Sequence, residues 1–160
     1  MTPNWFVAWP VAAAADWIAS LESGAPGGLH FLAPSDLHVT LAFLGRYEPV
    51  LLEKISSMLK QMPQEAIDIT PKDFVALPQP RRFSALAFTL GKGLSEVEKQ
   101  IARWRARICR EAGAHLDTRV SLPHFTVARV EMGSGLATNA CAPSGNLLFN
   151  FGQSLAKREG

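Results

Sequence analysis

A chain of 160 residues with 48% hydrophobic residues has the size and composition of one folded domain with a sizeable core. Its net charge of +2 and charged fraction of 19% argue against a histone-like nucleic-acid binder and long disorder, yet allow an anionic substrate. The two cysteines, Cys109 and Cys141, are too few for a disulfide scaffold, and no apolar run reaches the roughly 18 residues of a membrane span. We therefore expect a cytoplasmic protein without a membrane segment.

The N-terminal third predicts two strands and a helix ahead of a third, motif-bearing strand. Residues 5–9 form an apolar run typical of a buried strand, and Pro10 suits the first turn of a helix because its missing N–H costs nothing there. Apolar residues at helical spacing continue to Leu21, and a Gly- and Pro-rich segment then ends the helix. The predicted elements are a strand at 5–9, a helix at 10–21, a strand at 29–33 and a strand at 37–45.

The rest of the chain continues the alternation of strands and helices. The clearest helix follows Gly93, where apolar residues recur at steps of three and four. Its arginines are interpreted as a solvated face, and the four tryptophans of the chain as core. The predicted elements are a helix at 48–62, a strand at 66–70, a stretch at 74–77 that either resumes that strand or lies on the sheet edge, a loop at 77–82, a strand at 83–90, a helix at 94–113, strands at 116–122 and 123–130, a loop at 132–145 and a strand at 147–151.

Two short stretches repeat one pattern of histidine, apolar residue, threonine and apolar residue. They are His38-Val39-Thr40-Leu41 and His124-Phe125-Thr126-Val127. Side chains alternate between the two faces of a strand, so each stretch would present an imidazole and a hydroxyl on one face and bury the other. Two copies in one chain predict two neighbouring strands that bring both pairs to one cleft.

The surrounding elements repeat as well. Strand, helix, strand and motif strand occur over residues 5–45 and again over residues 83–130, and the two histidines are 124 − 38 = 86 positions apart. A pseudo-two-fold axis between two such units would place the motifs side by side. We therefore predict an α+β fold in a single domain, residues 1–160, with one lobe from 5–45 plus the C-terminal strand and another from 83–130.

The residue types of the two motifs suit displacement at phosphorus. Near neutral pH, a neutral imidazole can remove a proton from a nucleophile and a protonated one can give a proton to a leaving oxygen. The hydroxyls of Thr40 and Thr126 can donate hydrogen bonds to non-bridging phosphate oxygens. The sequence has neither a Gly-x-Ser-x-Gly motif nor the His and Cys spacings of a zinc site, so no metal is expected.

These motifs resemble the paired His-x-Thr-hydrophobic motifs of the 2H phosphoesterase superfamily. Residues 36–45 are similar to the first motif block of the bacterial RNA 2′,3′-cyclic phosphodiesterases, also called 2′-5′ RNA ligases, and Arg119 with residues 123–129 is similar to the second. Residues 6–10 resemble the opening strand and helix start of that family, and residues 151–155 resemble its closing segment. The resemblance thus touches both ends and both motifs.

The resemblance implies a bilobal α+β fold with antiparallel sheets around a central cleft, and a reaction without metal or organic cofactor. It implies hydrolysis of RNA 2′,3′-cyclic phosphate ends to a 2′-phosphate. In that scheme His124 accepts a proton from water, and His38 donates a proton to the departing 3′ oxygen. Thr40 and Thr126 bind the phosphate. A symmetric cleft also permits the reverse assignment of the two histidines.

The sequence gives less specific predictions for the arginines. Arg81 and Arg82 either contact an RNA phosphate or solvate their loop, and both readings stay open. Arg119 and Arg129 could add positive charge near the second motif. On a regular strand, however, Arg129 faces away from His124, because the two are an odd number of residues apart.

Several residues near the motifs are assigned no role in the site. By parity Phe43 points away from His38 and is predicted to be core. His30 and His115 have no accompanying threonine and are interpreted as ordinary surface or edge histidines. Leu122 departs from the family pattern, in which a basic or polar residue often stands before the proline of the second motif.

Three alternative functions remain open. The same site could join RNA ends as a 2′-5′ ligase, or could hydrolyse small cyclic nucleotides or 2′-5′ oligonucleotides. A binding module that holds RNA ends without turnover is the third, although pure binding needs no pair of proton carriers. The expected partner is RNA with a 2′,3′-cyclic phosphate terminus, a tRNA or nucleotide included, and the protein is expected to be a monomer.

Overall fold

The computed structural model describes residues 4–13, 15–25, 27–46, 52–79, 82–116, 122–130, 149–151 and 154–158. Within them, nine strands form a sheet in the order β4-β8-β1-β3-β7-β6-β5, with β9 paired to β1, β2 paired to β7, and every pair antiparallel. The strands are β1 (Asn4–Ala12), β2 (Leu29–Phe31), β3 (His38–Arg46), β4 (Ile67–Ile69), β5 (Pro71–Gln79), β6 (Arg82–Leu90), β7 (His124–Val130), β8 (Phe149–Phe151) and β9 (Ser154–Arg158). The helices are α1 (Ala15–Ser23), α2 (Leu52–Leu59) and α3 (Leu94–Ala112), and a 3₁₀ turn, η1 (Pro34–Asp36), precedes β3. The predicted α+β class with antiparallel strands is confirmed.

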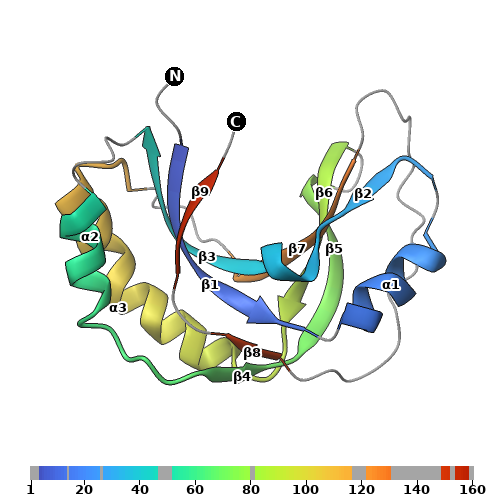
Figure 1. Cartoon of the computed structure of the whole chain (residues 1–160), viewed down its shortest axis with the longest axis horizontal. Coiled ribbons are helices and arrows are strands. Elements are labelled where there is room, and N and C mark those ends of the chain that lie inside the picture. The colour runs from blue at the N-terminus through green and yellow to red at the C-terminus, as the bar shows by residue number, and fades with distance from the viewer. Residues whose placement is uncertain are drawn as a thin grey trace.

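The sheet is strongly curved, and the helices lie on its outer side. Figure 1 shows β1, β3 and β9 on one side of the curve and β2, β5, β6 and β7 on the other, with α2 and α3 outside the first group and α1 outside the second. Trp17 of α1 packs against Phe88 and Phe125, with ring centroids 5.4 and 6.1 Å apart. The core therefore lies between helices and sheet, and we call the opposite face of the sheet the concave face.

The prediction that Pro10 opens a helix is wrong. β1 continues through Pro10 to Ala12, and α1 begins only at Ala15. Pro10 lies opposite His38 in the β1–β3 ladder, and the N–H of Val11 donates to the carbonyl of Leu37 at 2.8 Å. Strand pairing on both sides of the proline thus outweighs its preference for a helix start.

Many of the other predicted boundaries hold within one or two residues, but the helix predicted at 48–62 ends at Leu59, and the strand predicted at 74–77 begins at Pro71. The predicted loop at 77–82 is wrong, because β5 and β6 stay paired up to Gln79 opposite Arg82, which leaves only residues 80–81 between them. The edge reading of 74–77 is confirmed, since β5 ends the strand order and starts with Pro71. Residues 117–121 of the strand predicted at 116–122 and the loop at 132–145 lie outside the described residues. The division into two lobes of a single domain stays a prediction.

The start of α3 depends on a glycine for two separate reasons. Gly93 has φ = +86°, and a Cβ there would lie 2.5 Å from the carbonyl oxygen of Asp68 and 2.8 Å from a methyl of Ile69. Gly113, which ends the same helix, has φ = +65°, and a Cβ there would meet nothing within 4 Å. A side chain would therefore strain the backbone at both positions, but only at Gly93 would it also clash with neighbouring atoms.

We expect Gly93→Ala to lower the free energy of unfolding by more than Gly113→Ala does. Strain at positive φ costs each alanine variant about 1 kcal/mol or more, and only Gly93→Ala adds a clash with backbone. Urea unfolding of the two variants beside the unchanged chain measures the difference. Equal losses would contradict the tight contact between the start of α3 and β4.

Candidate active site

The two motif strands are neighbours, as the doubled pattern predicted. β3 and β7 pair antiparallel with Val39 opposite Phe125, and both of these side chains are fully buried. The histidine and threonine of each motif are instead partly exposed, on the concave face. The predicted alternation of one buried and one accessible face is therefore confirmed for both stretches.

The antiparallel register also determines which side chains are adjacent. With Val39 opposite Phe125, His38 lies across from Thr126 and Thr40 lies across from His124. Directly opposite residues on neighbouring strands have Cβ atoms about 4.5–5.5 Å apart. Two imidazoles and two hydroxyls thus converge on one area, related by a local two-fold axis that passes between the strands.

Both imidazoles are held in the same way. Nδ1 of His38 lies 2.8 Å from the carbonyl oxygen of Asp36, and Nδ1 of His124 lies 2.8 Å from the carbonyl oxygen of Leu122. A carbonyl can only accept a hydrogen bond, so Nδ1 carries the proton in each ring. Nε2 is then the nitrogen that accepts a proton when the ring is neutral and donates one when it is charged. The Phe6 ring also packs at 4.9 Å from His38, which further restricts that imidazole.

Phe43 does not belong to the core, which corrects the prediction from parity. Phe6 and Ala8 of β1 lie opposite Phe43 and Thr40, so the ladder skips Leu41 and contains a bulge at that residue. Because Phe6 and Ala8 share a face, Phe43 and Thr40 share one too, despite their odd spacing. Phe43 is accordingly 56% exposed, with its ring 6.2 Å from that of Phe6.

Arg129 is corrected for the same reason. Ala87 and Ala85 of β6 lie opposite Thr126 and Arg129, so this ladder skips Val127. Thr126 and Arg129 therefore share a face, and Arg129 is exposed on the concave side. Phe43 and Arg129 each follow a motif histidine by five residues, so the local two-fold relates them as well.

A pocket extends from the motif residues toward α3. Its lining includes Thr40 and His124 together with Phe43, Leu116 and Leu122. The last three are the large hydrophobic side chains that are exposed in the described part of the chain. An apolar rim therefore stands beside a polar centre, which suits a ligand with a phosphate and a flat ring.

The inner wall of this pocket contains residues that sequence reasoning placed elsewhere. His115, interpreted as an ordinary histidine, lines the pocket with Arg105 and Cys109. Burial raises the pKa of the Cys109 thiol, and the nearby Arg105 guanidinium opposes that shift only in part. Cys109 thus stays a neutral thiol near neutral pH and is a poor nucleophile there.

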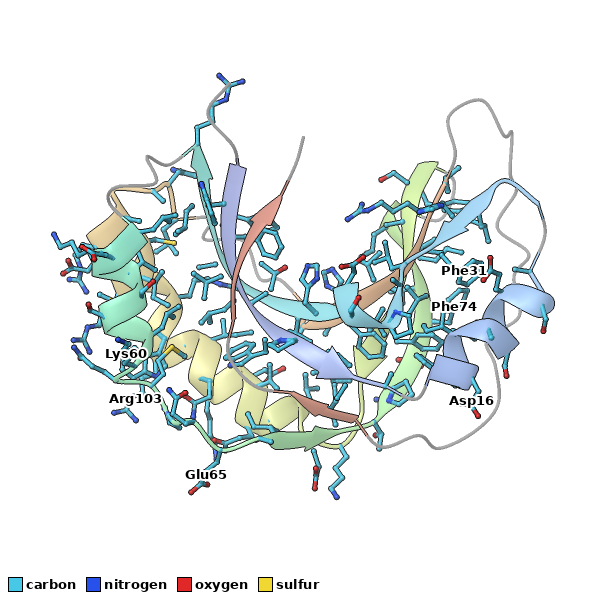
Figure 2. The ribbon with its side chains drawn as sticks, viewed as in Figure 1. Asp16, Phe31, Lys60, Glu65, Phe74 and Arg103 are labelled. Atoms are coloured by element: carbon cyan, nitrogen blue, oxygen red, sulfur yellow. The ribbon has the colours of Figure 1, made fainter. Side chains whose placement is uncertain are left out.

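The remaining candidates are distributed as follows. Arg81 and Arg119 lie outside the described residues, as does the side chain of Arg82. His30 of β2 lies opposite Arg129 and is exposed. Figure 2 shows Arg103 on the outer side of α3, which fits the solvated arginine face predicted for this helix.

The described residues can also be considered as metal ligands and as membrane-spanning helices. Among the residues that the structure describes, no group of three or more His, Cys, Asp or Glu side chains is placed to hold a metal ion. None of the helices in this same part of the chain combines the length and hydropathy needed to cross a bilayer.

The two residues that parity placed on the wrong face, Phe43 and Arg129, share one signal in the sequence. The repeat extends beyond His-x-Thr-x to an alanine, Ala42 in the first stretch and Ala128 in the second. In both strands this small residue follows the one that the ladder skips, Leu41 or Val127. The longer repeat could have suggested that parity fails at the same point in both motifs.

Comparison with known proteins agrees with this fold. Residues 9–84 match the family model described as LigT like phosphoesterase. The matched segment contains the first motif, so the resemblance to LigT-like phosphoesterases noted in the sequence is confirmed for this part of the chain. A comparison with curated proteins gives no match.

Solved structures show the same fold. The crystal structure of E. coli LigT with 3′-AMP superposes with a TM-score of 0.68 at 16% identity, covering 98% of this chain and 95% of that one. A phosphoesterase structure gives 0.70 at 16% identity, covering 98% and 96%, and a Thermus thermophilus protein gives 0.64 at 16%, covering 98% and 95%. The chain thus has a LigT-type fold over nearly its whole length.

Proposed function

We propose that the chain hydrolyses 2′,3′-cyclic phosphate at RNA ends to a 2′-phosphate, without a metal or organic cofactor. The observation that carries this proposal is the convergence of His38, Thr40, His124 and Thr126 on one face through a single antiparallel register. Two identically held imidazoles can act as acid and base in one turnover, and two hydroxyls can bind the phosphate between them. Both His–Thr pairs come from one chain, so we also propose that a monomer suffices.

The proposed step balances without a co-reactant other than water. Nε2 of neutral His124 accepts a proton from water while the water oxygen bonds to phosphorus. The bond from phosphorus to the 3′ oxygen breaks, and that oxygen takes the proton from Nε2 of charged His38. Thr40 and Thr126 donate hydrogen bonds to the non-bridging oxygens, where negative charge increases. The local two-fold symmetry also allows the reverse assignment.

The surroundings of the four residues support a nucleotide as the ligand. Phe43 offers an exposed ring next to Thr40, and Arg129 offers a guanidinium on the same face as Thr126. Aromatic rings stack on unpaired bases of any sequence, and guanidinium groups pair with phosphates. The E. coli protein of the same fold was crystallised with 3′-AMP, ATP and NADP+, and we extend nucleotide binding to this chain as part of the proposal.

We expect Phe43→Ala to raise KM for a cyclic-phosphate RNA by roughly 5- to 100-fold, with a smaller change in kcat. Stacking of a base on an aromatic side chain contributes about 1–3 kcal/mol, and the ring is absent from the proposed chemical step. Steady-state kinetics measures both constants, and Phe43→Tyr, which keeps the ring, is the control. An unchanged KM for Phe43→Ala would show that no base lies on this ring.

The deciding experiment uses a short RNA that ends in a 2′,3′-cyclic phosphate. The protein is incubated with it in excess EDTA, and the phosphorus is followed by NMR. A 2′-phosphomonoester supports the proposal, whereas a 3′-phosphomonoester would reverse the leaving group and the roles of His38 and His124.

Absence of turnover by folded protein would contradict the proposed activity. Small cyclic nucleotides and 2′-5′ linked oligonucleotides would then be tested at the same site, followed by joining of RNA ends. Tight, salt-dependent RNA binding without any reaction would favour a binding module instead.

A further inference from the structure

Arg105 differs from the other arginines of α3. Arg103 and Arg107 are exposed and lie over the Trp104 ring, at 5.3 and 5.2 Å from its centroid. Arg105 is half-buried, lines the pocket beside Thr40, and donates through Nε to the backbone carbonyl of Leu41. It therefore reaches from the helix layer to the edge of the motif strand, against the prediction that all these arginines are solvated.

The acceptor of this hydrogen bond is the residue at which β3 bulges. Leu41 is one of two positions skipped by the β1–β3 ladder, the other being Leu44, and the skip at Leu41 brings Phe43 onto the face of Thr40. A bulge leaves its extra residue outside the regular pairing, and a buried carbonyl without a donor is costly. A charged donor such as a guanidinium makes a stronger hydrogen bond than a neutral one.

In the second motif strand, the carbonyl at the equivalent position accepts a hydrogen bond from a backbone N–H. Val127, the residue skipped by the β6–β7 ladder, accepts a hydrogen bond from the N–H of Leu32 at 2.9 Å, in line with the pairing of β2 beside β7. The two bulges are thus equivalent in position but not in their donors. One is held by a neighbouring segment of main chain, and the other by a single side chain that mutation can remove.

We propose that Arg105 is a positioning residue that holds the bulge of β3 and so keeps Phe43 on the concave face beside Thr40. Without this donor, β3 relaxes toward regular pairing with β1, in which Phe43 turns toward the helices. The structural part of this proposal stands on the contacts above. Its kinetic consequence rests on the proposed function.

The structural test follows the ring contact between Phe43 and Phe6 by NMR, without any substrate. We expect the nuclear Overhauser effect between these two rings in the unchanged chain, its loss in Arg105→Met, and partial retention in Arg105→Lys, which keeps a charged donor. Arg103→Met, on the outer side of α3, is the matched control and should keep the contact. If Arg105→Met does not fold, Arg105→Leu takes its place, because it keeps an apolar side chain and also lacks a donor for the carbonyl of Leu41. A folded Met or Leu variant that keeps the ring contact overturns the proposal.

The kinetic test is a double-mutant cycle with Phe43 on the cyclic-phosphate RNA. Arg105→Met should raise KM by about tenfold, which matches a lost charge-assisted hydrogen bond, and should have little further effect in a Phe43→Ala background. Full additivity of the two changes would mean that Arg105 does not act through Phe43. If the chain turns over no RNA at all, the proposed function fails while the NMR result still decides the role of Arg105.

Discussion

Replacement of His38 or His124 by alanine is expected to lower turnover of RNA 2′,3′-cyclic phosphate by about 10²–10⁴ for each residue. General acid and general base catalysis each contribute about that factor. Both side chains are partly exposed, so the free energy of unfolding should change little. Single-turnover rates measured beside urea unfolding separate lost chemistry from lost folding.

The double variant should be about as slow as the slower single variant, because the two groups act in one step. Full activity of either alanine variant would remove the two-histidine mechanism. Arg103→Met again serves as the control, because this side chain lies on the outer side of α3, away from the two histidines.

A substrate with a good leaving group distinguishes acid from base. An aryl phosphodiester releases a phenolate that needs no proton, so it no longer depends on a general acid. We expect His38→Ala to recover most of its rate on such a substrate and His124→Ala to stay slow. Recovery by His124→Ala instead would exchange the two roles, which the local symmetry of the site allows.

Replacement of Thr40 or Thr126 by valine is expected to lower kcat by up to about 10²–10³, the usual loss for one donor to a developing negative charge. Valine keeps the β-branched shape, so the strand and its packing are preserved. Serine variants at the same positions keep the hydroxyl and should retain most of the rate. Single-turnover measurements at saturating RNA test this expectation.

Thr70→Val is the control that separates folding from catalysis. The Thr70 hydroxyl oxygen accepts a hydrogen bond from the N–H of Lys92 at 2.8 Å, away from the motif strands. This variant should lose stability while its kcat stays unchanged. Equal rates for Thr40→Val, Thr126→Val and Thr70→Val would show that the motif hydroxyls do not bind the phosphate.

The doubled motif made the centre of the site predictable. In each stretch the apolar neighbours of the histidine and threonine had to be buried, which placed both polar groups on one face. Two such strands bury most surface when they lie together, and Val39 indeed lies opposite Phe125. The roles of the four side chains as acid, base and phosphate ligands remain predictions.

The alternation of side chains predicted the wrong face for residues that follow a bulge in the pairing with a neighbouring strand. Phe43 and Arg129 were assigned to the wrong face, because the alternation of side chains holds only while a ladder stays regular. Whether a ladder skips a residue depends on the neighbouring strand, β1 or β6, and on what satisfies the freed carbonyl. The alanine shared by the two motifs marks the position of the bulge, but neither the partner strand nor the hydrogen-bond donor can be derived from the motif itself.

The sequence by itself determined the class of fold, the burial of one face of each motif strand and the spacing of histidine and threonine, because these follow from local periodicity. Only the tertiary structure decided that Pro10 stays in a strand, that both ladders bulge at the same point, and that Arg105 reaches Leu41. These features depend on which distant segments meet, as α3 meets β3. The two short repeats therefore predict the four central side chains of the site, and the long-range register of the sheet decides which residues surround them.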